Sequence, residues 1–452
     1  MTQWFRWLVP AAFASQARNA PGPPIAGISL RLIPVSMLVL TLSVWAGSST
    51  VLSWEACVQE AAANNPDLHS ARANLEAASF TAKGAYSGYL PQLSAETSYT
   101  DRSGSEATSG IAGVSTTSGT NYDASVLLSQ NLFAGFQDRA KIEQGAANRE
   151  VSEASLAVAK AKLSQDLKVA FVGLKYAQDN VILTENIMHR QEENLRLVGL
   201  RFESGNENKG SYLQTKASLA QARYDHLQSQ HDLVSAQAQL DRVLGRAEMD
   251  ELEARGDIPL IEPGTVPDFR ELARQVPNYQ QAAAQQKSAV AGVTLARSGL
   301  YPSLNLSGSV GRVGNDWFPD TTRRTVGLNL NVPIYSGGKD YYATKSAVSS
   351  LEAAASNTDS TEHQLLVNLK QTYASYAESA EKLKVDQAFL DAAFTRAEIA
   401  RSKYNNGLMS FEDWDRLESD LIQRQKNFLQ SQRDRVVAEA AWEQAQGKGV
   451  IP

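Results

Sequence analysis

The fold is decided by residues 138–203, which read DRAKIEQGAANREVSEASLAVAKAKLSQDLKVAFVGLKYAQDNVILTENIMHRQEENLRLVGLRFE. No proline interrupts this stretch, and at about 1.5 Å per residue it predicts one helix of roughly 100 Å. Apolar side chains recur at every seventh position: Leu167, Leu174, Val181, Met188, Leu195 and Phe202. Because seven residues fall slightly short of two helical turns, the repeat predicts a left-handed supercoil with neighbouring helices.

The same pattern occurs a second time, 202 positions later. The corresponding stripe is Leu369, Tyr376, Leu383, Leu390, Ala397 and Tyr404. The match continues beyond the helix, since Leu-Gln-Ser-Gln occurs at both 227–230 and 429–432, and Gly205 and Gly245 correspond to Gly407 and Gly447. We interpret the chain as a tandem duplication, which predicts one architecture built from two similar halves.

The composition fits long helices better than a thick globular core. Of the 452 residues, 43% are hydrophobic and 8% are aromatic. The formal net charge of -6 opposes nucleic acid as a main partner, because phosphate binding needs a basic surface. Cys57 is the only cysteine in the sequence, which excludes an internal disulfide and a metal site of several cysteines.

Residues 1–46 are typical of a leader rather than of mature protein. Arg31 precedes a largely apolar run at 32–45, and small residues follow from Ala46. A positive charge, a short apolar core and small residues predict a secretory signal peptide with cleavage near Ala46. The alternatives are an uncleaved anchor and a translation start at Met37 or another site.

Each half is predicted to contain a helix, a β-hairpin, the long helix and a return helix. In the first repeat, residues 50–245, the hairpin spans 91–133, the long helix 138–203 and the return helix 211–245. In the second repeat, residues 277–447, the hairpin spans 302–334, the long helix 340–405 and the return helix 411–447. Residues 246–276 are expected to connect the repeats, and 448–452 form a C-terminal tail.

The hairpins are predicted from a change in hydrophobic period from about 3.6 to 2 after Pro91 and Pro302. A polar loop at 103–120 is expected to join the first pair of strands. Each strand is about ten residues long, enough to cross a bilayer when tilted. Aromatic residues stand at the strand ends: Tyr89, Tyr99, Tyr122, Phe133, Tyr301, Trp317, Phe318 and Tyr335.

Four strands are too few to close a membrane barrel, and an open sheet edge in lipid is very costly. A membrane-spanning hairpin pair therefore requires that several copies of the chain assemble. The alternative is a soluble hairpin that caps a coiled coil.

With these elements in place, the sequence resembles the TolC-like outer membrane efflux proteins, the outer membrane factor family, over about residues 50–447. Four features at a common offset carry the resemblance. They are Leu-Pro-Gln-Leu at 90–93 and Tyr-Pro-Ser-Leu at 301–304, the strand-to-helix segments 130–135 and 332–338, the repeated order of elements, and the turns at 202–205 and 404–407.

The resemblance implies an α+β, mostly α fold: a long helical barrel built from the duplicated coiled coil, with four strands per chain. A homotrimer would close a twelve-stranded transmembrane β-barrel in the outer membrane and extend into the periplasm. The implied partners are a periplasmic adaptor (membrane fusion protein), an inner-membrane pump and outer membrane lipid, with no nucleic acid. The implied function is a passive export duct of a tripartite efflux or type I secretion system, for small molecules or polypeptides. The alternative is a periplasmic coiled-coil scaffold or adhesin without a pore.

The resemblance also implies site residues at the periplasmic tip. Tyr404 and Asp413 match positions that narrow the entrance in this family, while Ser211 stands where the first repeat of the family often carries an acid. Asp413 has an alternative role, since Ser410 three residues earlier predicts a helix cap. A gate without a full charge lock is therefore expected.

The adaptor-docking tip is expected at Gly205 and Asn206 in the first repeat and at Gly407 and Leu408 in the second. An exposed apolar Leu408 would suit docking, and the alternative is a contact that staples the helix end. Asn206 makes the first turn more polar.

Catalytic and cofactor roles find little support. His226 and His231 are five residues apart, so they do not share a helix face as metal ligands at i and i+4 would. Ser336 to Lys339 lacks the spacing of a phosphate loop and is interpreted as a turn. We expect no enzyme activity, no metal and no cofactor.

Overall fold

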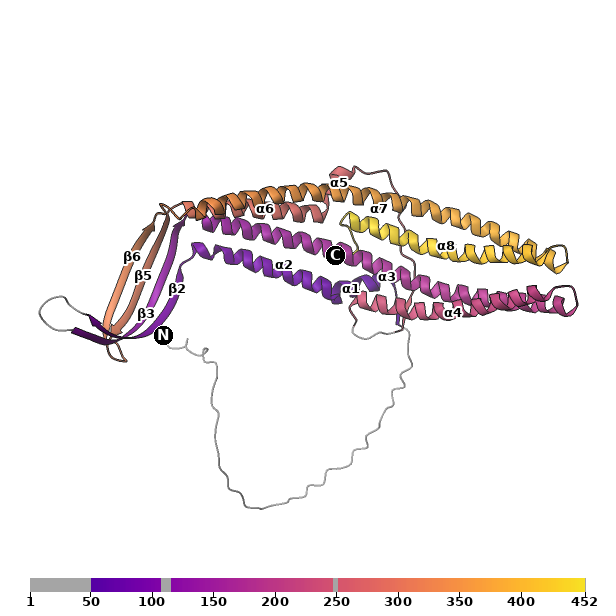
Figure 1. Cartoon of the computed structure of the whole chain (residues 1–452), viewed down its shortest axis with the longest axis horizontal. Helices are drawn as coiled ribbons and strands as arrows, with labels where there is room; N and C mark the ends of the chain where they lie inside the picture. The colour runs from indigo at the N-terminus through magenta and orange to yellow at the C-terminus, as the bar shows by residue number, and fades with distance from the viewer. Residues whose placement is uncertain (1–49, 107–114, 247–250, 452) are drawn as a thin grey trace, which may run out of the picture. The chain divides into compact units, whose positions relative to one another are not determined.

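The computed structural model of the chain describes residues 50–106, 115–246 and 251–451. Most of these residues lie in helices, and four antiparallel strands form one sheet (Figure 1). The predicted leader at 1–46 lies outside the described residues. Within the described ranges, no helix is both long enough and apolar enough to span a membrane.

The two longest elements are α3 (Gln137–Glu203) and α7 (Lys339–Asn405), each 67 residues long. Each begins after a residue in the left-handed conformation, Phe136 with φ 70° and Gly338 with φ 85°. Such a φ strains a residue that has a side chain. Edge-to-face contacts hold Phe136 there, because its ring lies 5.4 Å from that of Phe133 and 5.6 Å from that of Tyr301.

Only some residues of the predicted apolar stripe of α3 are fully buried. Leu167 and Leu174 are buried, whereas Phe202 is 38% exposed and the positions between them are half-buried. Beyond Leu174, the buried side chains follow a neighbouring stripe: Thr184, Ile187, Gln191, Asn194 and Val198. Burial along α3 therefore moves from the heptad stripe to the neighbouring one. Polar side chains are accommodated because they pair, as when the Thr184 and Ser229 hydroxyls meet at 2.8 Å.

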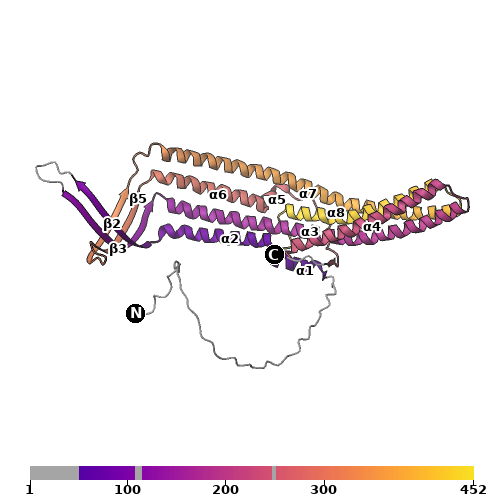
Figure 2. The same ribbon diagram turned by 60° about the horizontal axis from the view of Figure 1, so that its bottom comes forward.

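Shorter helices line the long ones. Near the sheet, α2 (Pro66–Gly84) packs on α3, and α6 (Pro277–Arg297) packs between α3 and α7. At the other end, α4 (Lys209–Leu244) packs on α3, and α8 (Phe411–Ala445) packs between α3 and α7 (Figure 2). The two repeats are therefore joined along α3.

The helical segment that precedes the first hairpin is divided at Pro66. It consists of α1 (Trp54–Asn64), α2 and a 3₁₀ turn, η1 (Ala85–Tyr89). The break falls at Asn65, whose side chain accepts a hydrogen bond from the Leu68 N–H at 3.0 Å, with Pro66 as the first helical residue. An amide cap followed by proline is a strong helix start. In the second repeat, α6 is likewise followed by η2 (Ser298–Leu300).

The sheet has the strand order β2-β3-β5-β6, and every neighbouring pair is antiparallel. Its strands are β2 (Gln92–Glu106), β3 (Ser115–Ala134), β5 (Ser303–Gly314) and β6 (Thr321–Asn331). Leu93 pairs with Leu128, and Leu304 with Leu330, so the two hairpins share one register. The expected loop at 103–120 was wrong at both ends, because backbone pairing continues to Glu106 and Ser115.

The segment predicted as an irregular connector contains structure that the sequence did not reveal. The strand β4 (Leu252–Ala254) pairs in parallel with β1 (Thr50–Leu52), and α5 (Phe269–Gln275) begins at an Asp268 cap. Both elements are very short, too short to show a hydrophobic period. The strand β4 adjoins a buried core that includes Trp54 and Phe171, whereas Ala273 of α5 belongs to a second core with Leu365 and Leu369.

A buried charge network fixes this connector to the helices. Lys168 of α3 contacts Glu439 of α8 at 3.4 Å, and Arg435 contacts the same carboxylate at 3.3 Å. The N–H of Ile261 in the connector donates to Glu439 Oε2 at 3.1 Å. All three charged side chains are at most 5% exposed. Three elements distant in sequence are thus held by one carboxylate.

Candidate functional site at the helical tip

Each long helix ends, at the end away from the sheet, in the same type of turn. Gly205 and Gly407 are left-handed, with φ of 76° and 71°. In the first turn, the N–H of Asn206 donates to the Arg201 carbonyl at 2.8 Å. The N–H of Gly205 donates to the Phe202 carbonyl at 3.0 Å, and the second turn repeats both bonds at the same lengths. This pair of bonds requires a positive φ, which explains the glycine in each repeat.

The return helices begin with equivalent caps. Asn208 Oδ1 accepts a hydrogen bond from the Ser211 N–H at 2.9 Å, and Ser410 Oγ accepts one from the Asp413 N–H at 3.1 Å. The Ser410 hydroxyl lies 2.9 Å from Asp413 Oδ2 and can donate to it. Asp413 therefore takes part in the cap. Its side chain is still 56% exposed and contacts Arg416 at 3.3 Å, which leaves the carboxylate accessible.

Tyr404 is completely buried in an aromatic cluster at the start of α8. Its ring stacks on that of Trp414 with centroids 4.5 Å apart and planes 1° from parallel. Phe411 lies edge-on to both rings. The guanidinium carbon of Arg201 lies 4.6 Å from the Tyr404 ring centroid. The ring is therefore fixed by packing, and only its hydroxyl and backbone are left to bond elsewhere.

Tyr404 joins the tips of the two repeats. Its hydroxyl donates to Glu207 Oε2 at 2.8 Å, and its carbonyl oxygen accepts from Arg201 Nη1 at 2.8 Å. Glu207 lies in the turn between α3 and α4, so both bonds cross from the second repeat to the first. Sequence reasoning singled out Tyr404 and missed both partners, because nothing in the local pattern near 201–207 indicates a contact roughly 200 residues away.

The carboxylate of Glu207 at the tip is a hydrogen-bond acceptor. Burial by itself would raise the pKa of Glu207, but hydrogen bonds from the Asn208 N–H and from the Tyr404 and Ser211 hydroxyls outweigh burial and hold the pKa below its ordinary value. Burial and the neighbouring carboxylate raise the pKa of Tyr404. At neutral pH a neutral phenol thus donates to an ionised carboxylate. Ser211 belongs to the site because its hydroxyl donates a hydrogen bond to Glu207.

The two docking candidates differ in exposure and chemistry. The Leu408 side chain is 77% exposed, so it does not staple the helix end, which was the alternative to docking. In the first turn the Asn206 amide donates to Ser204 Oγ at 3.0 Å and is held within its own turn. The turn of the second repeat is therefore apolar, and the turn of the first repeat is polar.

Two further ion pairs join the repeats just above the tip. Arg190 of α3 binds Glu418 of α8 through two bonds of 2.6 and 2.9 Å, and the Glu418 side chain is only 2% exposed. Arg401 of α7 binds Glu193 of α3 at 2.7 Å. Burial, together with the nearby Glu418 carboxylate, raises the pKa of Asp415. The two helix pairs are thus joined near the tip by charge contacts that sequence spacing could not identify.

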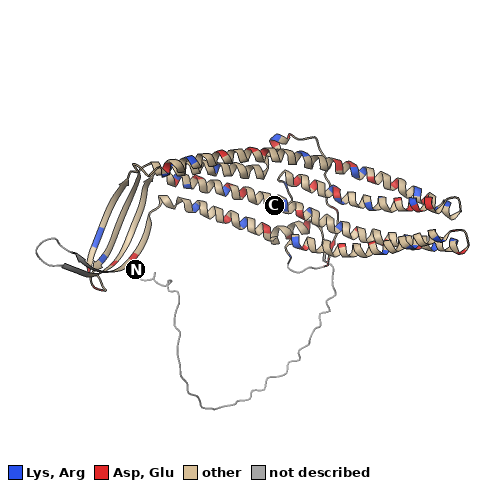
Figure 3. Ribbon diagram, viewed as in Figure 1, with Lys and Arg blue, Asp and Glu red and all other residues tan. Residues whose placement is uncertain are grey.

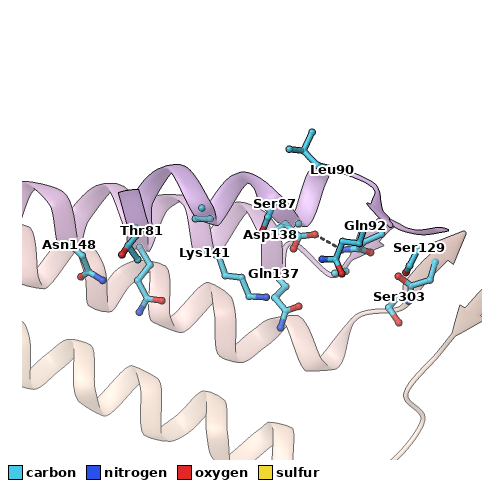
Figure 4. A pocket seen from close by; sticks show the side chains of 18 residues that line it. Thr81, Ser87, Leu90, Gln92, Ser129, Gln137, Asp138, Lys141, Asn148 and Ser303 are labelled. Atoms are coloured by element: carbon cyan, nitrogen blue, oxygen red, sulfur yellow. Dashed lines mark hydrogen bonds between the residues drawn. The ribbon is translucent and has the colours of Figure 1, made fainter. Parts of the chain in front are cut away.

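At the other end of the helices, a polar cavity of about 880 Å³ lies where α2 and α3 meet the sheet (Figure 4). Asp138, buried at 8% exposure, accepts a hydrogen bond from Asn131 in its wall. A Cβ on Gly88 would come within 2.2 Å of Asp138 Oδ1, and Gly299 stands in the same relation to Asp340 at 2.7 Å. Both repeats therefore need a glycine at this junction. Ser303 and Asn305 line the cavity from β5, which identifies the polar face of the sheet.

Residues weighed for chemistry are dispersed. His226 Nδ1 lies 3.3 Å from Thr184 Oγ1 and has no metal-binding neighbours in the described part of the chain. Ser336 to Lys339 forms the turn that leads into α7 through two left-handed glycines.

The fold is that of solved outer-membrane channels. The solved structure of the outer-membrane channel OprN matches with a TM-score of 0.79 and 21% identity, covering 88% of this chain and 91% of that one. The Campylobacter jejuni CmeC outer membrane channel matches with a TM-score of 0.79 and 18% identity, covering 88% and 86%.

A family model described as Outer membrane efflux protein matches residues 57–246 and 270–448. The chain belongs to this family, and the resemblance found in the sequence is confirmed. Members are transport channels of the outer membrane that extend into the periplasm and are not enzymes. The expected class of fold is confirmed as well.

Curated relatives are more distant in sequence. The alkaline protease secretion protein AprF of Pseudomonas aeruginosa is 24% identical over 298 residues, which is 64% of this chain and 62% of that protein. The outer membrane protein TolC of Escherichia coli is 22% identical over 406 residues, 85% of this chain and 79% of that protein.

Proposed function

We propose that three copies of this chain assemble into one continuous export channel through the outer membrane and into the periplasm. The observation that carries the proposal is the sheet: it has two open edges, β2 and β6, and one face of exposed apolar side chains. Open edges are not tolerated in lipid, so the edge strands of neighbouring copies must pair. Three four-stranded sheets would give the twelve-stranded barrel that the sequence led us to expect, and proteins of this family form trimeric channels.

The cargo that we propose is polypeptide. Two curated relatives, AprF and the proteases secretion protein PrtF of Dickeya chrysanthemi, carry protease secretion in their names. The polar, mixed-charge lining of the junction cavity suits an extended chain because it offers many hydrogen-bonding groups and no strong preference for one charge. A second candidate is efflux of small molecules, since the matching family is named for efflux.

At the tip, Tyr404, Glu207 and Arg201 would hold the entrance closed, with Ser211 and Asp413 at its rim. Support comes from the bonds between the repeats, which must break if one helix pair moves away from the other. Energy for opening would come from an inner-membrane pump, the partner that the family resemblance implies.

The adaptor, a membrane fusion protein, would dock at the second turn, where Gly407 shapes the backbone and Leu408 projects. Gly205 and Asn206 would offer a polar counterpart. Leu408→Asp should abolish co-purification with the adaptor while leaving trimers intact. Asn206→Asp, the matched change in the first turn, should reduce it less, and equal losses would contradict an apolar docking site.

The channel itself is tested by isolating outer membrane fractions and reconstituting the protein in planar bilayers. We expect heat-modifiable trimers that conduct ions. A soluble, extended dimer without conductance would refute the proposed function and favour the scaffold alternative.

A further inference from the structure

The two faces of the sheet are chemically distinct, and an antiparallel register shows which residue belongs to which face. Directly paired residues point to the same side. Ser303 and Asn305 line the polar cavity, so the odd-numbered residues of β5 face that side. Arg323 pairs with Gly311 and shares this face, where its guanidinium binds Asp123 at 2.9 Å. Arg323 is thus neutralised inside the proposed channel.

The opposite face is apolar and exposed. On β6 it carries Val326, Leu328 and Leu330, which are 84%, 64% and 62% exposed. Two arginines follow this apolar run at the end away from the helices: Arg312 opposite Thr322, and Arg324 opposite Val310. Figure 3 shows the strands largely free of charge except toward that end. Both arginines are exposed, and within the described residues neither guanidinium has an ion-pair or hydrogen-bond partner.

The arginines lie where the edge of the membrane should be. From Asn331, where β6 ends, to Arg324 the strand advances seven residues, roughly 23 Å along its own axis at about 3.3 Å per residue. The exposed Val332 and Ile334 continue the apolar run past the end of the strand, and the cost of a charge on the lipid face falls steeply near the interface. Tyr122, which pairs with Gly314, lies on the same face beside Tyr99 at 5.0 Å and Trp317 at 5.6 Å. Aromatic rings at this depth form an interfacial girdle.

We propose that Arg312 and Arg324 bind the phosphate groups of lipid A, the phosphorylated glycolipid of the outer leaflet. This inference rests on the proposed channel, which places the far end of the sheet at the outer surface. The two side chains sit diagonally on adjacent strands, within reach of one headgroup that carries two phosphates. A planar guanidinium suits bidentate binding of phosphate. The apolar residues below the pair would contact the acyl chains, which a free phosphate ion lacks.

In the assembled trimer, Arg312 should bind phosphate more strongly than Arg324. In the proposed trimer, β2 of the next copy would border β6 and bring its Asp101 near Arg324. Arg312 is one strand further in, between Ala124 and Thr322, and meets no carboxylate there. Replacing Arg312 alone should therefore remove most of the binding.

The test is binding of lipid A to purified trimers in neutral detergent, followed by native mass spectrometry and by thermal stability. Diphosphoryl lipid A should remain bound to wild type, and Arg312→Gln with Arg324→Gln should weaken binding at least tenfold. Arg323→Gln is the matched control, since this arginine lies between the other two in sequence but faces the channel; it should bind as wild type. Monophosphoryl lipid A should bind more weakly, and millimolar inorganic phosphate should not compete.

Equal binding by wild type and the double variant would overturn the proposal, as would an equal loss in Arg323→Gln or effective competition by inorganic phosphate. Conductance separates this outcome from failure of the proposed function. Trimers that conduct but do not distinguish the variants refute only the lipid site, whereas a wild-type chain that forms no conducting trimer refutes both. The variant Arg312→Lys keeps the charge and guards against misfolding; its binding should be intermediate.

Discussion

The hydroxyl of Tyr404 donates a hydrogen bond to Glu207 at 2.8 Å, and the two residues belong to different repeats. The Tyr404 ring is immobilised by stacking on Trp414, so this bond fixes the turn of the first repeat to a rigid part of the second. A contact of this kind resists separation of the two helix pairs. The hydrogen bond between Tyr404 and Glu207 is therefore the contact through which closure of the proposed entrance can be tested most directly.

Removing the Tyr404 hydroxyl should open the entrance. Tyr404→Phe keeps the stacking and loses the bond to a carboxylate, which is worth about 1.5–3 kcal/mol. Single-channel recordings should show an open probability or conductance above wild type, and Glu207→Gln should act in the same direction. Glu203→Gln, an exposed acid one turn back on α3, is the control and should behave as wild type. Unchanged conductance in both tip variants would remove this pair from the gate.

Closure should weaken in acid. The pKa of Glu207 is held below its ordinary value of 4.5, so its bonds stabilise the closed tip fully above that pH and are lost as pH falls through the lowered pKa. We expect constant conductance from about pH 8 to pH 5 and a rise below about pH 4.5. The rise should be absent in Glu207→Gln. Burial and the Glu418 carboxylate raise the pKa of Asp415, and this residue is present in both proteins, so it would affect their conductance alike.

Asp413 takes part in the cap of α8 and is proposed to narrow the entrance, and the two roles can be separated by experiment. Asp413→Ala should raise single-channel conductance above wild type if the carboxylate narrows the entrance. Ser410→Ala removes the cap of α8 and should cost about 0.5–2 kcal/mol of stability, with little direct effect on conductance. If Asp413→Ala lowers thermal stability like Ser410→Ala and leaves conductance unchanged, Asp413 serves only the cap.

Features with a local or repeated signal could be predicted from the sequence. The unbroken run at 138–203 indicated a long helix, and α3 spans Gln137–Glu203. The change of period after Pro91 indicated a strand, and the repeat supplied its counterpart after Pro302. These predictions succeed because hydrogen bonding and burial along one element impose their own period.

Features that depend on distant partners could not be predicted. Glu207 is an ordinary polar turn residue until Tyr404 is placed beside it. The pairing of β1 with β4 joins three residues to three others about 200 positions away. The 103–120 segment is rich in Ser, Thr and Gly and suggested a loop, yet strand pairing satisfies its backbone groups up to Glu106. Composition describes side chains, whereas these outcomes were decided by backbone pairing and tertiary contact.

The buried charge network should be sensitive to loss of its single central acid. Glu439→Gln preserves shape but removes the carboxylate that pairs with Arg435 and leaves Lys168 with Glu443 alone, at 2.7 Å; breaking a buried pair typically costs about 3–5 kcal/mol. Thermal unfolding followed by circular dichroism should show a clearly lower midpoint. Glu412→Gln, at an exposed site on the same helix, should leave the midpoint unchanged. Equal midpoints would mean that water or a rearranged network compensates.

The duplication also predicts how neighbouring copies meet. Within the chain, Val126 of β3 pairs with Val310 of β5. The repeat equivalent of Val126, 202 positions later, is Leu328 of β6, and the repeat equivalent of Val310, 211 positions earlier, is Tyr99 of β2. The same shifts correctly relate the Leu93–Leu128 pair of the first hairpin to the corresponding pair of the second. The seam between copies should therefore have the register of the seam inside the chain.

Cysteines at Leu328 and Tyr99 should consequently cross-link copies into covalent trimers. Directly opposite residues have Cα atoms about 4.5–5.5 Å apart, within the range of a disulfide. The native Cys57 will not interfere, because it is fully buried and burial raises the pKa of its thiol to about 11. Denaturing gels under oxidising conditions should show trimers for Leu328→Cys with Tyr99→Cys. Leu328→Cys with Ala95→Cys places the second thiol four residues away, roughly 13 Å along the strand, and should stay monomeric. The reverse result would show that the copies pair in another register.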